Sequence, residues 1–302
     1  MALPTQVTLV DVGPRDGLQN EKQLVSVDDK ARLVHLLHEA GLKEIEVTSF
    51  VSPKWVPQMG DNAAVMAAIE RRADVRYSVL TPNMKGFEAA LATAPQEIVV
   101  FAAASEAFSQ KNINCSIAES IERFAPVVQA AHAAGMRVRA ALSCCLGCPY
   151  QGEVTPDEVE RVVKLLKDVG VDHMSIADTI GVGTPRKVQR AMEAALSVYA
   201  LDEVSGHFHD TYGQALANTL ATLEMGVWQY DTSVAGLGGC PYAKGATGNV
   251  ATEDVVYMLH GMGIATGIDL DRLIDAGVYI SDFLGRKTQS RVATALLNKR
   301  AG

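Results

Sequence analysis

Short apolar segments alternate with longer amphipathic segments along the whole chain. The apolar segments have the length of buried strands, and the longer segments repeat their apolar side chains with the period of a helix. This pattern predicts eight strands, at residues 6–12, 44–49, 76–80, 97–101, 137–142, 172–177, 204–208 and 230–235. Helices are expected between the strands and after the last one, and two more are expected near residues 270–284 and 289–299.

Eight regular strand–helix units predict an α/β fold, a (β/α)₈ TIM barrel with extra C-terminal helices. A doubly wound open sheet is the alternative, but the regular repeat favours closure. No Pro-rich or Ser-rich linker divides the chain, so we expect one catalytic domain over residues 1–302. The barrel is expected to occupy about 6–260 and the extra helices about 269–299. A long polar loop, which includes residues 111–114, is expected after the fourth strand.

Two histidines, His207 and His209, lie at the end of the seventh predicted strand. Side chains two residues apart in a strand point to the same face. A helical pattern follows over 212–225, with Asp210 or Thr211 as its first capping residue. Two converging imidazoles can hold a divalent metal together with oxygen ligands. The alternative is a pair of hydrogen-bonded histidines without a metal.

Composition and charge limit the class of partner. The chain has 302 residues, of which 48% are hydrophobic and 21% charged, with a formal net charge of -8. An acidic chain of this kind argues against a broad nucleic-acid surface. No apolar run reaches the length of a membrane span, and no signal or transit peptide is expected. The odd number of cysteines, 5, favours reduced thiols and a cytoplasmic location.

The loops that follow the strands of a barrel form one face, and active sites lie there. Polar residues that the pattern places on this face are Asp11, Arg15, Asp16, Gln19, Glu46, Thr48, Ser49, Ser143, Cys144, Cys145, Asp178, Thr179, His207, His209, Cys240 and Asn249. An Asp, two His and an Asn make a mixed oxygen and nitrogen set that suits Mg²⁺ or Mn²⁺, or Zn²⁺. A metal in such a set polarises the oxygen atoms of a bound ligand.

Two further residues of this face offer chemistry beside a metal. Arg15 can stabilise an enolate or another oxyanion, and its alternative role is a salt bridge to Glu46 or Asp178. Cys240, in a Gly-rich loop, can donate or accept a proton, and its alternative is an inert loop cysteine. Residues with basic or amide side chains near the same loops can bind a phosphorylated ligand or simply be solvated, namely Lys22, Lys54, Lys85, Lys111 and Asn112.

Two other motifs are weaker indicators. Cys144, Cys145 and Cys148 provide three thiols without the fourth ligand of a structural zinc site. The glycines of residues 236–239 lack the Lys-Ser/Thr of a phosphate-binding loop and follow the last strand instead of the first.

Three stretches carry a resemblance to a known family: GPRDGLQNE at 13–21, SFVSPKWVPQM at 49–59 and GLGGCPYA at 236–243. They resemble the 3-hydroxy-3-methylglutaryl-CoA lyases, and the resemblance runs from residue 7 to about 292. The Arg-Asp-Gly and His-x-His pieces alone indicate only the wider superfamily of metal-dependent lyases and aldolases, which includes isopropylmalate and homocitrate synthases. The loop with Cys240 narrows the resemblance to the lyases.

The resemblance implies a carbon–carbon lyase of the oxo-acid-lyase class that cleaves 3-hydroxy-3-methylglutaryl-CoA (HMG-CoA) into acetyl-CoA and acetoacetate. It implies a Mg²⁺ or Mn²⁺ ion held by Asp16, His207, His209 and Asn249. It also implies that Arg15 stabilises the enolate and Cys240 transfers a proton. The expected catalytic residues are Arg15, Glu46, Asp178, His207 and Cys240. The expected substrate-binding residues are Arg15, Gln19, Lys22, Asn112 and Ser143. Either Asp178 or a metal-activated group takes the hydroxyl proton.

The family context also implies a homodimer or other homo-oligomer and a place in leucine degradation or ketone-body metabolism. The chain departs from the animal members in showing no mitochondrial leader, no peroxisomal C-terminal tripeptide and no C-terminal regulatory cysteine. Ala141 stands where those enzymes have a Tyr at the rim, which bears on acyl-chain specificity. A condensing synthase that uses acetyl-CoA and a 2-oxo acid, and a metal-stabilised barrel that only binds CoA, are the competing interpretations.

Overall fold

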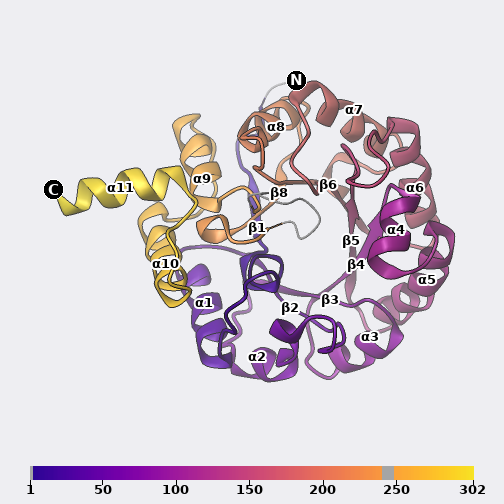
Figure 1. Ribbon diagram of the computed structural model, residues 1–302, viewed down its shortest axis with the longest axis horizontal. Helices are drawn as coiled ribbons and strands as arrows, with labels where there is room; N and C mark the ends of the chain where they lie inside the picture. Colours follow the sequence, from indigo (N-terminus) through magenta and orange to yellow (C-terminus); the bar gives the residue numbers. More distant parts are fainter. Residues whose placement is uncertain (1–2, 240–247) are drawn as a thin grey trace.

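The computed structural model describes residues 3–239 and 248–302. Its centre is a closed barrel of parallel strands in which each strand pairs with its neighbours in sequence and β8 pairs with β1 (Figure 1). The strands are β1 (Thr8–Asp11), β2 (Glu44–Ser49), β3 (Arg76–Leu80), β4 (Glu97–Ala103), β5 (Arg137–Ser143), β6 (His173–Asp178), β7 (Val204–Phe208) and β8 (Gln229–Thr232). The predicted TIM barrel is therefore confirmed.

Helices form a ring around the strands (Figure 1). They are α1 (Val27–Glu39), α2 (Asn62–Ala68), α3 (Met84–Leu91), α4 (Glu106–Ile113), α5 (Ile117–Ala133), α6 (Pro156–Asp168), α7 (Pro185–Leu196), α8 (Ala215–Leu223), α9 (Thr252–Gly261), α10 (Leu270–Phe283) and α11 (Arg291–Ala301). Short helical turns are η1 (Gly13–Gly17), η2 (Pro57–Met59), η3 (Leu201–Glu203) and η4 (Val234–Gly236). No helix within the described residues has both the length and the apolar character needed to cross a membrane.

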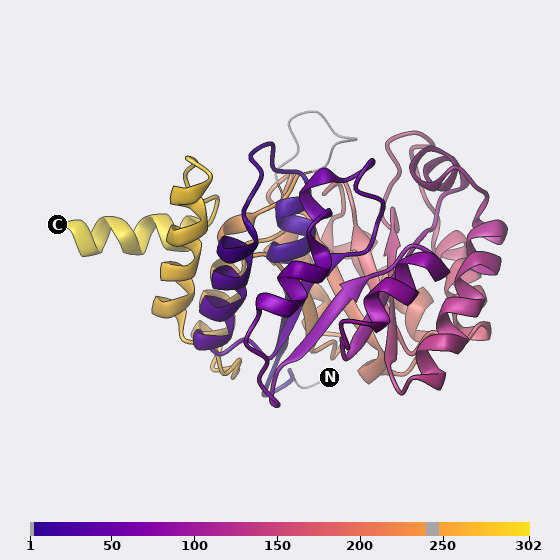
Figure 2. The same ribbon diagram turned by 90° about the horizontal axis from the view of Figure 1, so that it is seen from below.

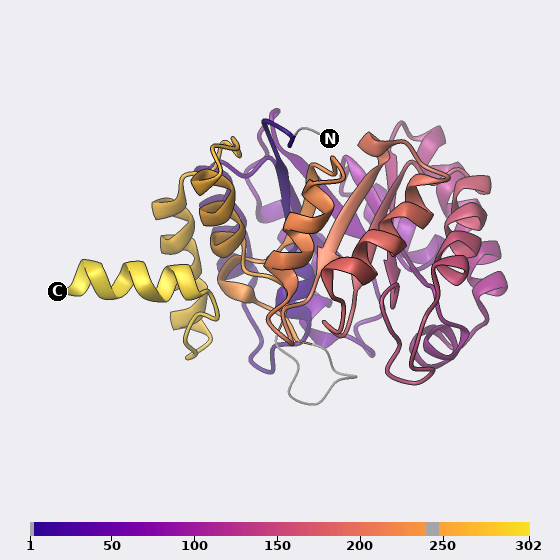
Figure 3. The ribbon, with the colours of Figure 1, turned by 90° about the horizontal axis from the view of Figure 1, so that it is seen from above.

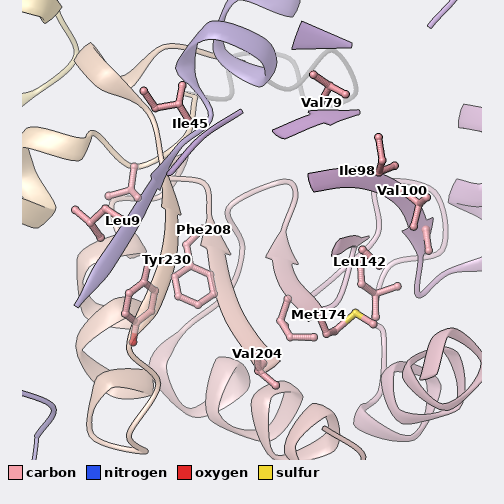
Figure 4. Close-up of a cluster of buried hydrophobic side chains, with 14 of the residues drawn as sticks. Leu9, Ile45, Val79, Ile98, Val100, Leu142, Met174, Val204, Phe208 and Tyr230 are labelled. Carbon is pink, nitrogen blue, oxygen red and sulfur yellow. The ribbon is translucent and has the colours of Figure 1, made fainter. Parts of the chain in front are cut away.

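The main apolar core lies between the strands and the surrounding helices (Figure 4). Leu9, Phe208 and Tyr230 belong to it and are at most 2% exposed. The hydroxyl of Tyr230 lies 3.1 Å from that of Thr222 on α8, which confirms that this side of β8 faces outward. Burying one such large side chain contributes roughly 1.5–3 kcal/mol to folding. Because alternate residues of a strand face opposite sides, the neighbours of these core residues point into the barrel.

The prediction of a long polar loop after the fourth strand is wrong, because residues Glu106–Ile113 form α4. The hydroxyl of Ser105 caps it by accepting a hydrogen bond from the Phe108 N–H at 3.3 Å. Asn114 ends the helix in a left-handed conformation, with φ of 51°. Few apolar residues mark this helix, so its local caps define it more clearly than its hydrophobic pattern does.

Two predicted boundaries also differ from the structure. Strand β8 ends at Thr232, and the residues after it form η4, because Ala235 takes a left-handed conformation with φ of 56°. Helix α8 begins at Ala215 instead of residue 212, since Gly213 has a positive φ of 69°. Asp210 still acts near the helix start, where its carboxylate accepts a hydrogen bond from the Ala215 N–H at 3.0 Å.

The two predicted C-terminal helices are present as α10 and α11. Helix α10 packs beside α1 and α9, whereas α11 extends away from the barrel (Figures 2 and 3). The start of α11 is tied to α9, because the Ser290 hydroxyl donates to the Asp254 carboxylate at 2.6 Å. The division of the chain into a single domain stays a prediction.

Candidate metal and catalytic site

A cluster of three potential ligands lies at the C-terminal mouth of the barrel. His207 lies near the end of β7, His209 follows that strand, and Asp16 comes from η1, which follows β1. One ligand atom from each residue lies within 4.8 Å of the others. The two imidazole rings have centroids 5.4 Å apart. The chain therefore brings together two nitrogen ligands and one carboxylate, although they are about 190 residues apart in sequence.

The side chain of Asn249 joins this cluster. Its amide nitrogen donates to the Asp16 Oδ2 at 2.8 Å. Its Oδ1 atom is buried without a hydrogen-bond partner among the described residues, and so is the Nδ1 atom of His209. Buried polar atoms are rarely left unpaired, so both atoms call for a partner. Amide oxygen, imidazole nitrogen and carboxylate oxygen fit a divalent cation such as Mg²⁺ or Mn²⁺.

The turn η1 sets the positions of Arg15 and Asp16. It begins directly after β1, where the Asp11 carboxylate accepts a hydrogen bond from the Gly13 N–H at 2.8 Å. It closes at Gly17, whose N–H donates to the Val12 carbonyl at 3.1 Å. A Cβ atom at Gly17 would lie 2.7 Å from Leu237 Cβ, so this close approach requires glycine. The sequence GPRDG thus makes a compact turn that presents two charged side chains to the barrel mouth.

Arg15 is held by carboxylates on two sides. Its Nε atom donates to Glu46 on β2, and its Nη1 atom donates to Asp16 at 2.6 Å. No hydrogen bond joins its Nη2 atom to any described residue. Arg15 is 6% exposed and lies in a site where charge interactions are strong. The arrangement presents a fixed positive charge beside the potential metal ligands.

A buried ionic network lies beneath the site, and the sequence pattern did not predict its central residue. Arg139 on β5 reaches across the barrel and contacts Glu46 at 2.7 Å, Asp231 at 2.6 Å and Glu97 at 3.1 Å. Asp231 on β8 in turn lies 3.2 Å from His207 Nδ1. Arg139, Glu46, Glu97 and Asp231 are at most 2% exposed. Arg139 and Asp231 are charged residues within predicted strands. A charge inside a strand that is expected to be buried is the signal that could have revealed both residues.

The electrostatics keep the ligand atoms of Asp16 and His209 available to a cation, whereas at His207 burial is outweighed by the hydrogen bond and the charge of Asp231, which raise the pKa of this histidine. Burial would raise the pKa of Asp16, but the charge of Arg15 and then the nearby imidazoles outweigh it and lower this pKa to about 2. Burial, reinforced by the charge of His207, lowers the pKa of His209 to about 4. Asp16 is therefore ionised and His209 neutral near pH 7. A metal needs both groups in these forms.

Asp178 ends β6 beside the strand that carries the histidines, and its carbonyl accepts a hydrogen bond from the His209 N–H at 3.4 Å. Its carboxylate accepts hydrogen bonds from the backbone N–H groups of Val182 at 3.1 Å and Gly183 at 2.8 Å. Burial raises its pKa to about 6, although these bonds act in the opposite direction. These contacts shape the loop after β6, and a role for Asp178 in proton transfer stays a prediction.

The remaining predicted site residues differ in their surroundings. Ser143 is buried at the end of β5, Gln19 is half-buried and Lys22 is exposed. Asn112 lies on α4 instead of in a loop. The substrate-binding roles of these four residues stay predictions. Cys240 lies outside the described residues.

The thiols of the β5–α6 connection are buried. Burial raises the pKa of Cys145 to about 12 and also raises that of Cys144. Cys148 accepts hydrogen bonds from the backbone N–H groups of Tyr150 and Gln151, both at 3.4 Å. Protonated thiols are poor metal ligands, so this geometry favours a structural role over a second metal site.

Comparison with known proteins shows the family to which the chain belongs. The family model described as HMGL-like matches residues 6–280. The chain belongs to the HMGL-like family. A protein of Pseudomonas aeruginosa named 3-hydroxy-3-isohexenylglutaryl-CoA/hydroxy-methylglutaryl-CoA lyase is 58% identical over 299 residues, which cover 99% of this chain and 100% of that protein. The human protein named hydroxymethylglutaryl-CoA lyase, mitochondrial, is 55% identical over 293 residues, covering 97% of this chain and 90% of the relative.

Solved structures of HMGL-like proteins match the barrel closely. The crystal structure of hydroxymethylglutaryl-CoA lyase from Pseudomonas aeruginosa superimposes with a TM-score of 0.97 at 58% identity, covering 99% of this chain and 100% of that one. An HMG-CoA lyase from Acinetobacter baumannii, in complex with coenzyme A and 3-methylmalate, gives a TM-score of 0.93 at 35% identity, covering 98% and 96% of the two chains. The predicted family resemblance is confirmed.

Proposed function

We propose that this chain is a metal-dependent carbon–carbon lyase that cleaves HMG-CoA into acetyl-CoA and acetoacetate. The observation that carries the proposal is the meeting of Asp16, His207 and His209 beside the guanidinium of Arg15. A retro-Claisen cleavage needs an electrophile at the C3 hydroxyl and a cation at the thioester. In a chain of the HMGL-like family, the cluster would hold the metal that acts as this electrophile, and Arg15 supplies the cation beside it.

The cleavage moves one proton off the substrate and one onto it. The C3 hydroxyl loses its proton as the C2–C3 bond breaks, so that C3 becomes the ketone of acetoacetate. The bond electrons pass to C2 and the thioester oxygen, which together form the enolate of acetyl-CoA. A proton delivered to C2 then completes acetyl-CoA.

Each residue of the cluster has a role in this scheme. Asp16, His207, His209 and Asn249 hold a Mg²⁺ or Mn²⁺ ion, which when bound polarises the oxygen atoms of the substrate. Arg15, fixed by Glu46 and Asp16, would direct its Nη2 group, which has no partner among the described residues, at the developing enolate oxygen. Cys240 supplies the proton to C2, and Asp178 or a group activated by the metal accepts the hydroxyl proton.

Removal of the metal tests the function directly. Acetoacetate release from HMG-CoA is expected to stop after EDTA treatment and to return when Mg²⁺ or Mn²⁺ is added, because the ligand cluster alone supplies no strong electrophile. His207→Ala is expected to lose activity at all practical metal concentrations. An Asp172→Asn variant, altered at the opposite end of the barrel, serves as the control. Tight thioester binding by the wild type without cleavage would contradict the lyase and direct the next assay to condensation with 2-oxo acids.

The position of Ala141 in the barrel supports a second substrate with a longer substituent at C3. The name of the Pseudomonas relative includes 3-hydroxy-3-isohexenylglutaryl-CoA. In β5, Ala141 shares the inward face with Arg139 and pairs in register with Phe101 on β4 and with Ser175 on β6. Ala141 and Phe101 are both partly exposed. Their small and apolar side chains therefore line the barrel interior above the ionic network. We propose that this wall accepts the longer C3 substituent as well as a methyl group.

The variant Ala141→Tyr separates the two substrates. A phenol at this position fills the inward wall, so kcat/KM for the isohexenyl substrate is expected to fall by about tenfold or more relative to that for HMG-CoA. The exposed Ala89→Tyr on α3 is the matched control and should change neither value. Steady-state kinetics with both thioesters provides the measurement. An equal decrease for both substrates would contradict a role of Ala141 in specificity.

The wider setting of the enzyme follows from the same proposal. The substrate is an acyl-CoA thioester, and the reaction suits leucine degradation or ketone-body metabolism. We also propose a cytoplasmic enzyme that forms a homodimer or another homo-oligomer. The oligomer and the pathway follow from the family resemblance, and the cytoplasmic location follows from the odd number of cysteines.

A further inference from the structure

We propose that Asp231 is a positioning residue that fixes the ring tautomer of His207, and that Arg139 holds Asp231 and Glu46 so that His207 and Arg15 meet at one point. This inference rests on the proposed metal site. It assigns positioning functions to Asp231 and Arg139, two buried residues outside the ligand cluster.

The contacts of Asp231 define the orientation of the histidine. Its Oδ1 atom accepts a hydrogen bond from Arg139 at 2.6 Å, and its Oδ2 atom accepts one from the Ser175 hydroxyl at 2.8 Å. The same Oδ2 atom lies 3.2 Å from His207 Nδ1. A carboxylate beside an arginine is ionised and can only accept hydrogen bonds. His207 must therefore carry a proton on Nδ1, which leaves the lone pair of Nε2 for a cation.

Arg139 extends this control to the other side of the site. Its guanidinium spans the barrel interior from β5 to carboxylates on β2, β4 and β8. Glu46 on β2 uses one oxygen for Arg139 and the other for Arg15. One buried arginine thus fixes the supports of both a metal ligand and the catalytic cation. Because its five N–H groups have a rigid planar geometry, a lysine cannot reproduce these contacts.

The variant Asp231→Asn tests the tautomer assignment with little change in shape. The asparagine oxygen can still accept from Arg139, and its amide group then faces His207 Nδ1. Two donors cannot face each other, so the ring is expected to move its proton to Nε2 and lose its free lone pair there. Changes of this kind in the support of a ligand typically weaken metal binding about 10–100-fold. Mn²⁺ titration of the full chain, followed by EPR without substrate, measures this affinity.

A matched control exists at the other end of the barrel. Asp172 lies 2.9 Å from His132 and forms a second aspartate–histidine pair among the described residues. Asp172→Asn makes the same chemical change far from the ligand cluster and should leave Mn²⁺ affinity unchanged. An unchanged Mn²⁺ affinity in a folded Asp231→Asn variant would overturn the proposal.

A measurement on the wild type keeps the proposal testable even if a variant fails to fold. In ¹⁵N-histidine-labelled protein saturated with Mg²⁺, the His207 signals, assigned by their loss in His207→Gln, should show a protonated Nδ1 and an unprotonated Nε2. Protonation at Nε2 instead would refute the assignment. HMG-CoA cleavage by the same wild-type preparation tests the proposed function separately, so the two proposals can fail independently.

Discussion

Replacement of Arg15 by glutamine is expected to lower kcat for HMG-CoA cleavage by about 10²–10³-fold, the usual effect of removing one preorganised electrostatic stabiliser. Arg15 is 6% exposed and held by Glu46 and Asp16, so its charge is in place before the enolate forms. A stabiliser that acts on the transition state more than on the bound substrate changes kcat more than KM. Steady-state assays of acetoacetate release, at saturating Mg²⁺, provide the measurement.

Two controls distinguish lost catalysis from lost structure in the Arg15→Gln variant. Its Mn²⁺ affinity should stay within a few-fold of that of the wild type, since Asp16, His207 and His209 remain. Its thermal unfolding should still show a folded protein. A kcat within threefold of the wild-type value would show that Arg15 only forms salt bridges at the barrel rim and does not stabilise the enolate.

Replacement of Arg139 by methionine should have the largest effect on stability, a loss of about 3–5 kcal/mol in the free energy of unfolding. The methionine fills similar space but leaves Glu46, Glu97 and Asp231 in the barrel interior without their shared cation. Desolvated carboxylates are costly when they lose a cation, and although Glu46 keeps Arg15 and Glu97 keeps Arg137, Asp231 keeps no arginine among the described residues. Urea unfolding followed by far-UV circular dichroism gives the free energies for both proteins.

The surface pair of Lys164 and Glu160 supplies the matched control. Lys164→Met also removes a cation from an ion pair, but the lysine side chain is 58% exposed. Exposed pairs contribute about 0–1 kcal/mol, so little change is expected. If Arg139→Met loses no more stability than Lys164→Met, the network would not be a determinant of barrel stability.

Some residues of the site could be predicted from the sequence, and others could not. Asp16 could be identified because it follows an apolar strand, and His207 and His209 because their spacing puts both on one face of a predicted strand; parallel strands of a barrel end on one face. Arg139 and Asp231 were not identified, although both lie in predicted strands. Their chemistry depends on partners across the barrel interior, and no local pattern encodes a contact between β5 and β8.

Local hydrogen bonds account for the errors in the predicted elements. Helix α4 was assigned to a loop because its pattern is weakly amphipathic, whereas its caps at Ser105 and Asn114 are clear. The predicted strand at 230–235 extends beyond the observed end of β8 at Thr232, because all of these residues were expected to be buried. Ala235 in fact turns there, and its N–H donates to Glu253 at 2.9 Å. A burial pattern does not distinguish a strand from a buried turn.

The sequence by itself determined the barrel, the face that carries the site and the residue types that suit a divalent metal. These features follow from hydrophobic periodicity and short motifs, which are local properties of the chain. Only the tertiary structure decided that Asn249 reaches Asp16, that Glu46 holds Arg15, and that Arg139 joins Glu46 to Asp231. The physical reason is that closure of the barrel brings strands from both ends of the chain together, so charges far apart in sequence are desolvated as one network.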